Sequence, residues 1–310
     1  MAVDTTVRRR RAEKKIAVLG GDLRQMVTAK ALAEDGYEVA VYAIDTYLGG
    51  WGEVTRAADL LSAVSGAHFV LLPLPVSADG ERLHCPLTKK TVLLKEVFDA
   101  LSHGQHVAGG KVSRAVYDMA EEKGIVIYDY LAREELAVAN AVPTAEGALA
   151  IAMAEVPYTI HGARCLVLGY GRVGKTLAKT LSALGAHVTV AARKPEDLAW
   201  IAANGHEPLL FSALYDCEEG QILPYGIVFN TVPKQVVGAK LLSHLKNDVL
   251  LLDLASAPGG IDREYARDHG YHVVWALSLP GKTAPVTAGR IIKDSILGIL
   301  ESIERGEDVQ

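Results

Sequence analysis

The sequence predicts an α/β protein with two consecutive Rossmann-like, doubly wound parallel-sheet domains and a cleft between them. Three observations carry this prediction. Apolar runs alternate with helical patterns along the chain, one segment repeats an earlier one, and the later copy contains a glycine-rich turn. With 310 residues, half of them hydrophobic, the chain is long enough for two buried cores.

Short apolar runs mark the predicted strands, because runs of this length between helical patterns are typical of buried parallel strands. The N-terminal set is Lys15–Leu19, Glu38–Ala43, Phe69–Leu72, His106–Ala108 and Val126–Tyr128. The C-terminal set is Arg164–Leu168, His187–Ala192, Ile227–Asn230, Val249–Leu252 and His272–Trp275.

The two sets are similar in sequence. A shift of 149 residues places Ile16–Ala43 on Cys165–Ala192 without a gap, and many paired positions are identical. A little later, His68–Pro75 parallels Gly226–Pro233. These matches indicate an internal repeat; the alternative is that any two strand–turn–helix–strand units look alike. Both interpretations give two doubly wound units, one after the other.

Composition excludes several classes of protein. A net charge of −5 gives no broad electrostatic case for a nucleic-acid partner. No apolar run of about 18 residues is found, so no membrane partner is expected, and no signal-peptide core follows Arg8–Arg11. Cys85, Cys165 and Cys217 are too widely spaced for a disulfide framework or a metal cluster. We therefore expect no metal and a reducing cytoplasm.

The second copy contains Gly169-x-Gly171-x-x-Gly174 between a predicted strand and a predicted helix. In a dinucleotide-binding turn, the second glycine lets the pyrophosphate approach the backbone and the third lets the helix pack against the strand. We expect the whole turn to bind the cofactor, through Gly169, Tyr170, Gly171, Arg172, Val173 and Gly174. The alternative is a Rossmann-like unit without a ligand.

The first copy lacks this glycine pattern. It has Gly20, Asp22 and Gln25 at the matching positions. Asp22 would set a negative charge and a side chain against a phosphate. We therefore expect the first copy to bind no dinucleotide in the usual way and to serve the substrate instead.

Two cations follow the second strand of the later copy. Enzymes that use NAD usually have Asp or Glu there, which accepts a hydrogen bond from the ribose 2′-hydroxyl. This chain has Arg193 and Lys194, and a guanidinium can hold a 2′-phosphate through two hydrogen bonds. The sequence therefore favours NADP (NADPH) over NAD. In the alternative, both cations face solvent before the turn at Pro195.

Two further strand ends complete the predicted cofactor site. The third strand of the unit closes with groups that fit beside the nicotinamide ribose, namely Asn230, Thr231, Val232 and Pro233. After the fourth strand, Asp253 and Ala255 are expected to form the floor of the nicotinamide pocket. An Asp at a strand end often caps a loop, which is the alternative for Asp253.

The domain boundaries follow from these assignments. We expect a disordered basic leader at residues 1–14, an N-terminal Rossmann-like substrate domain at 15–140, and an NADP-binding Rossmann domain at 141–310. The last domain includes a linking helix, within a stretch that Pro143 should break, and the C-terminal helix Gly289–Arg305. In two-domain dehydrogenases such a last helix often returns to the first domain.

Lactate-type chemistry is not expected. Two-domain dehydrogenases of 2-hydroxy acids carry an arginine soon after the fourth strand of the cofactor domain, but the corresponding stretch LASAPGG has no cation. No histidine paired with a carboxylate stands out, and no nucleophile elbow or P-loop is found.

Five further stretches resemble a known family. They are GGDLRQ (Gly20–Gln25), LLPLPVSADG (Leu71–Gly80), AREELAVANAVPTAEGAL (Ala132–Leu149), DLASAPGG (Asp253–Gly260) and LPGKTAPVTAG (Leu279–Gly289). With the NADP-type turn, they closely resemble the A subunits of dipicolinate synthases from spore-forming bacteria. The resemblance runs from about Lys15 to the final helix.

This resemblance implies an NADP-dependent oxidoreductase in the mother-cell cytoplasm during sporulation. It implies a flavoprotein-like partner, the B subunit, and a small dicarboxylate substrate, 4-hydroxy-tetrahydrodipicolinate. The product is dipicolinate (pyridine-2,6-dicarboxylate), formed by dehydration and hydride transfer to the nicotinamide. The resemblance gives no settled catalytic residue, and the sequence leaves open a homo-oligomer.

A dianionic substrate calls for cations and hydrogen-bond donors. For substrate binding we expect Arg24, Lys111, Arg133, Asn140, Thr144 and Thr283. As catalytic residues we expect Lys282, Ser256 near the nicotinamide, and Glu146 as the proton acceptor if one is used. Structural alternatives exist, because Arg24 and Arg133 can pair with neighbouring acids and the lysines can lie in solvent.

Two other functions remain open. The chain could be an NADP-linked dehydrogenase of another small acid, closer to the shikimate or alanine types. It could also be a non-catalytic NADP-binding scaffold for a second protein, because no catalytic histidine is evident.

Overall fold

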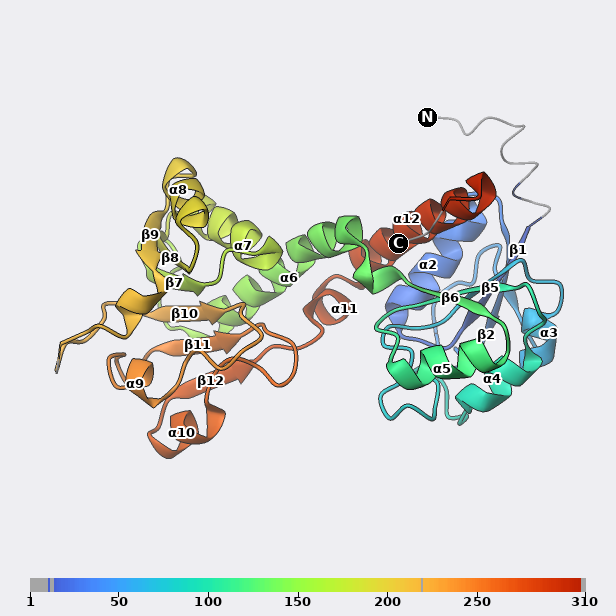
Figure 1. The fold of residues 1–310 in the computed structure, drawn as a ribbon, viewed down its shortest axis with the longest axis horizontal. Helices are drawn as coiled ribbons and strands as arrows, with labels where there is room; N and C mark the ends of the chain where they lie inside the picture. The colour runs from blue at the N-terminus through green and yellow to red at the C-terminus, as the bar shows by residue number, and fades with distance from the viewer. Residues whose placement is uncertain (1–10, 12–13, 219, 308–310) are drawn as a thin grey trace. The chain divides into compact units, whose positions relative to one another are not determined.

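The computed structural model describes residues 11, 14–218 and 220–307 (Figure 1). The chain forms two compact units. The first contains the residues up to Ala139 together with those from Pro285 onward, and the second is Asn140–Ala284. Each unit is built on one parallel six-stranded sheet.

The first unit has the strand order β3-β2-β1-β4-β5-β6. Its strands are β1 (Lys15–Leu19), β2 (Glu38–Tyr42), β3 (Thr55–Arg56), β4 (Phe69–Leu71), β5 (His106–Gly109) and β6 (Val126–Asp129). Its helices are α2 (Leu23–Glu34), α3 (Leu60–Val64), α4 (Leu94–Ala100), α5 (Arg114–Glu122) and α12 (Pro285–Arg305), with the 3-10 turn η1 (Tyr130–Ala132).

The second unit has the strand order β12-β11-β10-β7-β8-β9. Its strands are β7 (Arg164–Leu168), β8 (His187–Ala192), β9 (Glu207–Leu210), β10 (Ile227–Asn230), β11 (Leu250–Asp253) and β12 (His272–Trp275). Its helices are α7 (Arg172–Ala183), α8 (Pro195–Ala203), α9 (Ala239–Leu242), α10 (Arg263–Asp268) and α11 (Leu279–Thr283), with the turn η2 (Phe211–Leu214). The linking helix α6 (Glu134–Glu155) begins in the first unit and ends in the second.

The two units share one topology, as the internal repeat predicts. Counted from its own first strand, each sheet has the doubly wound order 3-2-1-4-5-6. The predicted shift of 149 residues carries β1 onto β7 and α2 onto α7 with identical bounds. The strand order reverses between β1 and β4 in one unit and between β7 and β10 in the other, where such folds bind ligands.

Each sheet is covered on both faces, so its strands are apolar throughout. In β1, Ile16 and Val18 pack against α2 and α12, whereas Ala17 and Leu19 pack against α3, α4 and α5. All four side chains are at most 1% exposed. In the second unit, α6, α7 and α8 cover one face and α9 and α10 cover the other. This burial explains why unbroken apolar runs mark the strands.

The C-terminal helix corrects the expected boundary at 141–310. Helix α12 belongs to the first unit and lies along α2 (Figure 1). The Thr28 hydroxyl donates to the Gly289 carbonyl at 2.8 Å, and a Cβ on Gly289 would lie 2.7 Å from the Arg24 carbonyl oxygen. Its apolar stripe, including Ile292 and Ile296, fills the core of that unit. The return to the first domain seen in other dehydrogenases therefore occurs here.

Helix α6 also differs from expectation, because it runs through Pro143 without ending. By length and composition alone it could cross a membrane, although the sequence was expected to contain no such stretch. The core helix of a soluble protein passes the same test. Ala145, Ala148 and Ala152 are fully buried in the core of the second unit, which accounts for part of the apolar composition.

Two other differences lie at the edges of the sheets. The short strands β3 and β9 were not predicted, because both are edge strands with mostly exposed residues and no apolar alternation. Of the expected leader 1–14, all but residues 11 and 14 lie outside the described residues. The Arg11 guanidinium lies 5.3 Å from the centre of the Tyr37 ring.

Candidate functional site

The glycine-rich turn after β7 has space in front of it. Gly169 has a φ of +99°, and a Cβ there would lie 2.6 Å from the Thr231 hydroxyl oxygen. A Cβ on Gly174 would lie 2.1 Å from the Gly169 carbonyl oxygen. These two glycines are therefore required for packing. A Cβ on Gly171 would meet no described atom within 4 Å, so the backbone is open to a ligand there.

Helix α7 begins at this turn with its N-terminus uncapped. Gly171 is the N-cap residue, and no side chain caps the first turn within the described structure. The first amide groups of a helix have no partner inside the helix, and the helix dipole adds partial positive charge to them. The geometry therefore suits a phosphate group, which is the role predicted for Gly169–Gly174.

The matching turn of the first unit is filled by the chain itself. Asp22 caps α2 by accepting from the Arg24 backbone amide at 2.9 Å. The same carboxylate accepts from Arg24 Nε at 3.0 Å and from a terminal guanidinium nitrogen at 2.8 Å. An internal anion thus occupies the place where the second unit is open. This geometry agrees with the expectation that the first copy binds no dinucleotide.

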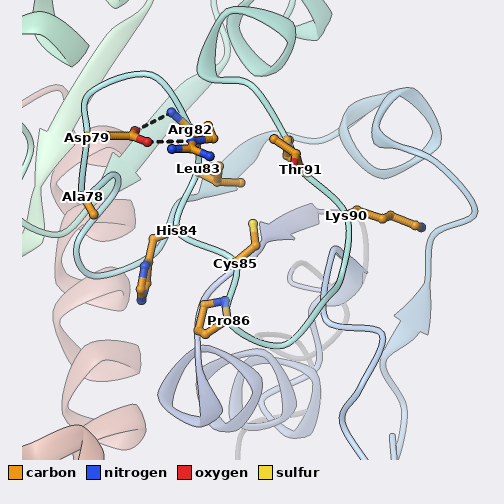
Figure 2. Close-up of a pocket in the computed structure, with 10 residues that line it drawn as sticks. Ala78, Asp79, Arg82, Leu83, His84, Cys85, Pro86, Lys90 and Thr91 are labelled. Atoms are coloured by element: carbon orange, nitrogen blue, oxygen red, sulfur yellow. Dashed lines mark hydrogen bonds and ion pairs between the residues drawn. The ribbon is translucent and has the colours of Figure 1, made fainter.

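The loop after β4 closes this turn further. The Gly21 amide donates to the His84 carbonyl at 2.9 Å, and a Cβ on Gly20 would lie 2.5 Å from Cys85 Sγ. This loop encloses a pocket of about 280 Å³, with the Asp79–Arg82 ion pair beside it (Figure 2). Burial raises the pKa of the Cys85 thiol to about 11, so it is protonated at neutral pH and is no nucleophile.

The side chains of Asn230 and Asp253 hold loops together. The Asn230 amide donates to Asp253 Oδ1 at 2.8 Å, and Asp253 Oδ2 accepts from the Gly260 and Ile261 amides at 2.7 and 3.2 Å. Both side chains are completely buried. This arrangement favours the structural alternative for Asp253, because its carboxylate is used within the protein.

Their neighbours shape the same strand ends. The Thr231 hydroxyl donates to the Leu168 carbonyl at 2.8 Å and so ties β10 to the start of the glycine-rich turn. The Ala255 amide donates to Asp253 and its side chain is buried. Val232 is half-buried and Pro233 is exposed. These residues offer backbone and apolar contacts at the edge where β7 and β10 diverge.

Arg193 and Lys194 follow β8 and are both exposed. Lys194 Nζ lies 3.7 Å from Glu196 Oε1, and both of these side chains are about two-thirds exposed. A pair so exposed is weak and leaves the ammonium accessible to a ligand. The two residues that directly follow the strand are thus cations, and the first acid after them is Glu196.

Of the four cations among the predicted substrate-binding and catalytic residues, two are engaged with the protein. Arg24 is 7% exposed and also donates to the Leu74 carbonyl at 2.8 Å. Arg133 forms an ion pair with Glu135, the alternative that the sequence left open. Lys111 and Lys282 are exposed, and neither ammonium has an ion pair within the described part of the chain.

Lys111 lies in an unusual loop after β5. Its φ is +57°, a left-handed conformation that is uncommon for a residue with a side chain. Asp129 holds the loop there, because its two carboxylate oxygens accept from the Lys111 and Val112 amides at 3.0 and 2.9 Å. Sequence reasoning missed Asp129, whose only signal is its place at the end of a predicted strand.

The remaining candidates lie on the second unit. The Thr144 hydroxyl donates to the Asn140 carbonyl at 2.7 Å, and the Thr283 hydroxyl donates to the Leu279 carbonyl at 2.8 Å. Both hydroxyls are therefore engaged within their own helices. A Cβ on Gly147 would lie 2.9 Å from the Thr283 hydroxyl oxygen, so α6 and α11 are in close contact. Glu146 and Ser256 are exposed.

Two family models match the chain. Residues 15–131 match the N-terminal domain of the dipicolinate synthase A subunit. Residues 131–260 match the NAD binding domain of D-isomer specific 2-hydroxyacid dehydrogenases. The boundary between the two matches falls at the start of the linking helix.

Relatives from two Bacillus species resemble nearly the whole chain. The dipicolinate synthase A subunit of Bacillus subtilis (strain 168) is 31% identical over 297 residues, which are 94% of this chain and 98% of the relative. The crystal structure of the same protein from Bacillus halodurans is 30% identical with a TM-score of 0.85, over 93% of this chain and 98% of that one. The Bacillus subtilis crystal structure is 30% identical with a TM-score of 0.84, over 95% and 98%.

Proposed function

Since the chain belongs to the family of dipicolinate synthase A subunits and is an NAD(P)-dependent oxidoreductase, we propose that it uses NADP to form dipicolinate. The proposed substrate is 4-hydroxy-tetrahydrodipicolinate. The observation that carries the cofactor choice is the pair of exposed cations after β8, where an acid would serve NAD. Arg193 would hold the 2′-phosphate through two charge-assisted hydrogen bonds, with Lys194 beside it.

The rest of the proposed cofactor site is the open turn of the second unit. The amides around Gly171 and the uncapped end of α7 would hold the pyrophosphate. Thr231, Val232, Pro233 and Ala255 would line the nicotinamide end. Asn230 and Asp253 would act by holding these loops in shape.

The proposed substrate is a dianion, so its binding calls for cations. Lys111 is exposed, and we assign to it a carboxylate of the substrate. Lys282, also exposed, keeps its proposed catalytic role. Arg24 and Arg133 would support the site through their ion pairs. Asn140 and Thr144 lie on α6, and Thr283 lies on α11. Their proposed role is to keep these two helices in shape beside the substrate.

The proposed reaction does not require a strong general acid or base, because its product is aromatic. The substrate loses water and then two electrons as a hydride, with one proton, and the ring becomes aromatic. Bound NADP would take up the hydride. The chain's task is to hold the dianion in register for that transfer. Glu146, exposed on α6, would accept the proton, and Ser256 would lie near the transferred hydride.

The relatives are named as A subunits, which supports the existence of a second subunit, and we infer that it is a flavoprotein-like B subunit. We also infer that the pair acts in the mother-cell cytoplasm. The chain described here would supply the nicotinamide chemistry of the pair.

Absorbance at 340 nm tests the proposal. The purified chain, with the B subunit and NADP, should show a substrate-dependent rise together with formation of dipicolinate. Binding of NADPH without any substrate-dependent change would instead favour a non-catalytic scaffold. A rise only with a different small acid would favour a dehydrogenase of the shikimate or alanine types.

A further inference from the structure

A groove on the second unit shares only Tyr170 with the proposed cofactor contacts and none of the proposed substrate contacts. It runs between α7 and the turn that joins α8 to β9, and it encloses about 570 Å³. We call it the α7 groove. Its lining is Tyr170, Lys175, Thr176, Lys179, Ser182, Ala183, Asn204 and His206. This lining contains two lysines and no acid.

The two lysines are placed like a pair of ligands for an anion. Lys175 and Lys179 are four residues apart on α7, so they lie on the same side of the helix, one turn apart. Both are exposed, and within the described part of the chain neither has an ion pair. Like charges at this spacing destabilise a helix, and an anion between them would relieve the repulsion.

The aromatic wall of the groove is fixed in place. The Tyr170 ring lies 5.2 Å from Lys175 Nζ, and its hydroxyl accepts from Asn204 Nδ2 at 3.3 Å. Asn204 Nδ2 also donates to the Trp200 carbonyl at 2.8 Å, which anchors the amide to α8. Because Lys175 and Asn204 both contact Tyr170, this side chain should lose little conformational entropy when a ligand binds.

The His206 ring supplies an unused polar group. This residue is 9% exposed, and its Nδ1 is buried without a hydrogen-bond partner among the described atoms. Buried polar atoms are nearly always paired, so an unpaired one calls for a water or a ligand. Burial lowers the pKa of His206, which favours the neutral ring, with one nitrogen a donor and the other an acceptor.

We propose that the α7 groove binds a phosphate group, either free or esterified to a small molecule. Two ammonium groups, the Ser182 hydroxyl and the His206 ring would surround it. The groove shares only Tyr170 with the glycine-rich turn. Because Tyr170 lies between Gly169 and Gly171, occupancy of the groove should change the affinity of the turn for its own ligand.

Calorimetric titration with inorganic phosphate and with ribose 5-phosphate tests this site. We would use the full chain bearing Arg193→Ala and Lys194→Ala, so that the cations after β8 do not contribute. Saturable binding is expected, and Lys175→Ala with Lys179→Ala should weaken it by at least about tenfold. Both lysines are exposed, so the variant should fold, as circular dichroism would verify.

A comparison of the two probes distinguishes the sources of the phosphate. Tighter binding of ribose 5-phosphate would identify a phosphate ester, and tighter binding of phosphate would identify the free ion. Absence of saturable heat with both probes would overturn the proposal. Equal affinity with and without the two lysines would overturn it as well. His206→Asn provides a second variant, which should weaken binding without removing a charge.

Discussion

Gly171 and Asp22 occupy the same position in the two copies of one strand–turn–helix unit. At Gly171 the space in front of the helix is open for a phosphate. At Asp22 the same space holds a carboxylate, which caps the helix and pairs with Arg24. This side chain and the loop after β4 thus close, in the first unit, the space that the second unit leaves open for an anion.

Placing the aspartate in the second copy tests this account. Gly171→Asp should fold, because a Cβ there meets no described atom within 4 Å. Its carboxylate should repel the pyrophosphate and lower the affinity for NADP by at least about tenfold. Isothermal titration would measure this change. Gly171→Ala is the matched control, since it adds a methyl group without charge; wild-type affinity in Gly171→Asp would refute the comparison.

Lys111 allows a similar test of substrate binding. Asn tolerates the left-handed conformation better than most residues, so Lys111→Asn should keep the loop and remove only the ammonium. We expect the KM for the dicarboxylate to rise about tenfold or more, with no change in the Kd for NADP. Steady-state kinetics and calorimetry would measure the two values. An unchanged KM would remove Lys111 from the site, and Lys123→Asn is the control on the same unit.

At the scale of elements, α12 shows how a helix distant in sequence completes a core. Ile292, Ile296 and Ile299 are nearly or fully buried among residues of α2 and β1. The apolar stripe of α12 could be predicted from its spacing. Its partner could not, because the same stripe would fit either sheet.

Truncating a buried side chain of this apolar stripe should destabilise the first unit. Ile296→Ala leaves a cavity in a fully buried position, so the free energy of unfolding should fall by about 2–5 kcal/mol. Urea denaturation followed by circular dichroism would measure it. Glu301→Ala, exposed on the same helix, should change it little. An equally small effect of Ile296→Ala would contradict the placement of α12.

Elements that are buried on both faces could be predicted from their apolar sequence, and exposed edge elements could not. Strands such as β7 and β10 are covered on both faces, so their apolar runs were evident in the sequence. Strand β9 lies at an edge, where three of its four residues are exposed and the pattern is lost. Pro143 was expected to end a helix, yet α6 continues, because propensity is a weaker constraint than packing.

At the scale of the whole molecule, topology was easier to predict than the state of each side chain. The shared strand order follows from the repeat and the glycine-rich turn. Besides its local pair with Asp22, Arg24 is engaged by the Leu74 carbonyl, and Asp253 is engaged by the Gly260 and Ile261 amides. Such hydrogen bonds join loops that only the folded sheet brings together. Sequence reasoning therefore found the cofactor unit but could not separate accessible cations from paired ones.

The central claim is that the second unit binds NADP through the cations after β8. Calorimetric titration with NADP and NAD, for the wild type and Arg193→Asp, tests it most directly. We predict tight binding of NADP, weak binding of NAD, and a loss of affinity for NADP of at least about tenfold in the variant. Lys246→Asp, exposed on the same unit, should leave the preference unchanged. Equal affinity for the two nucleotides, or a preference that survives Arg193→Asp, would contradict the claim.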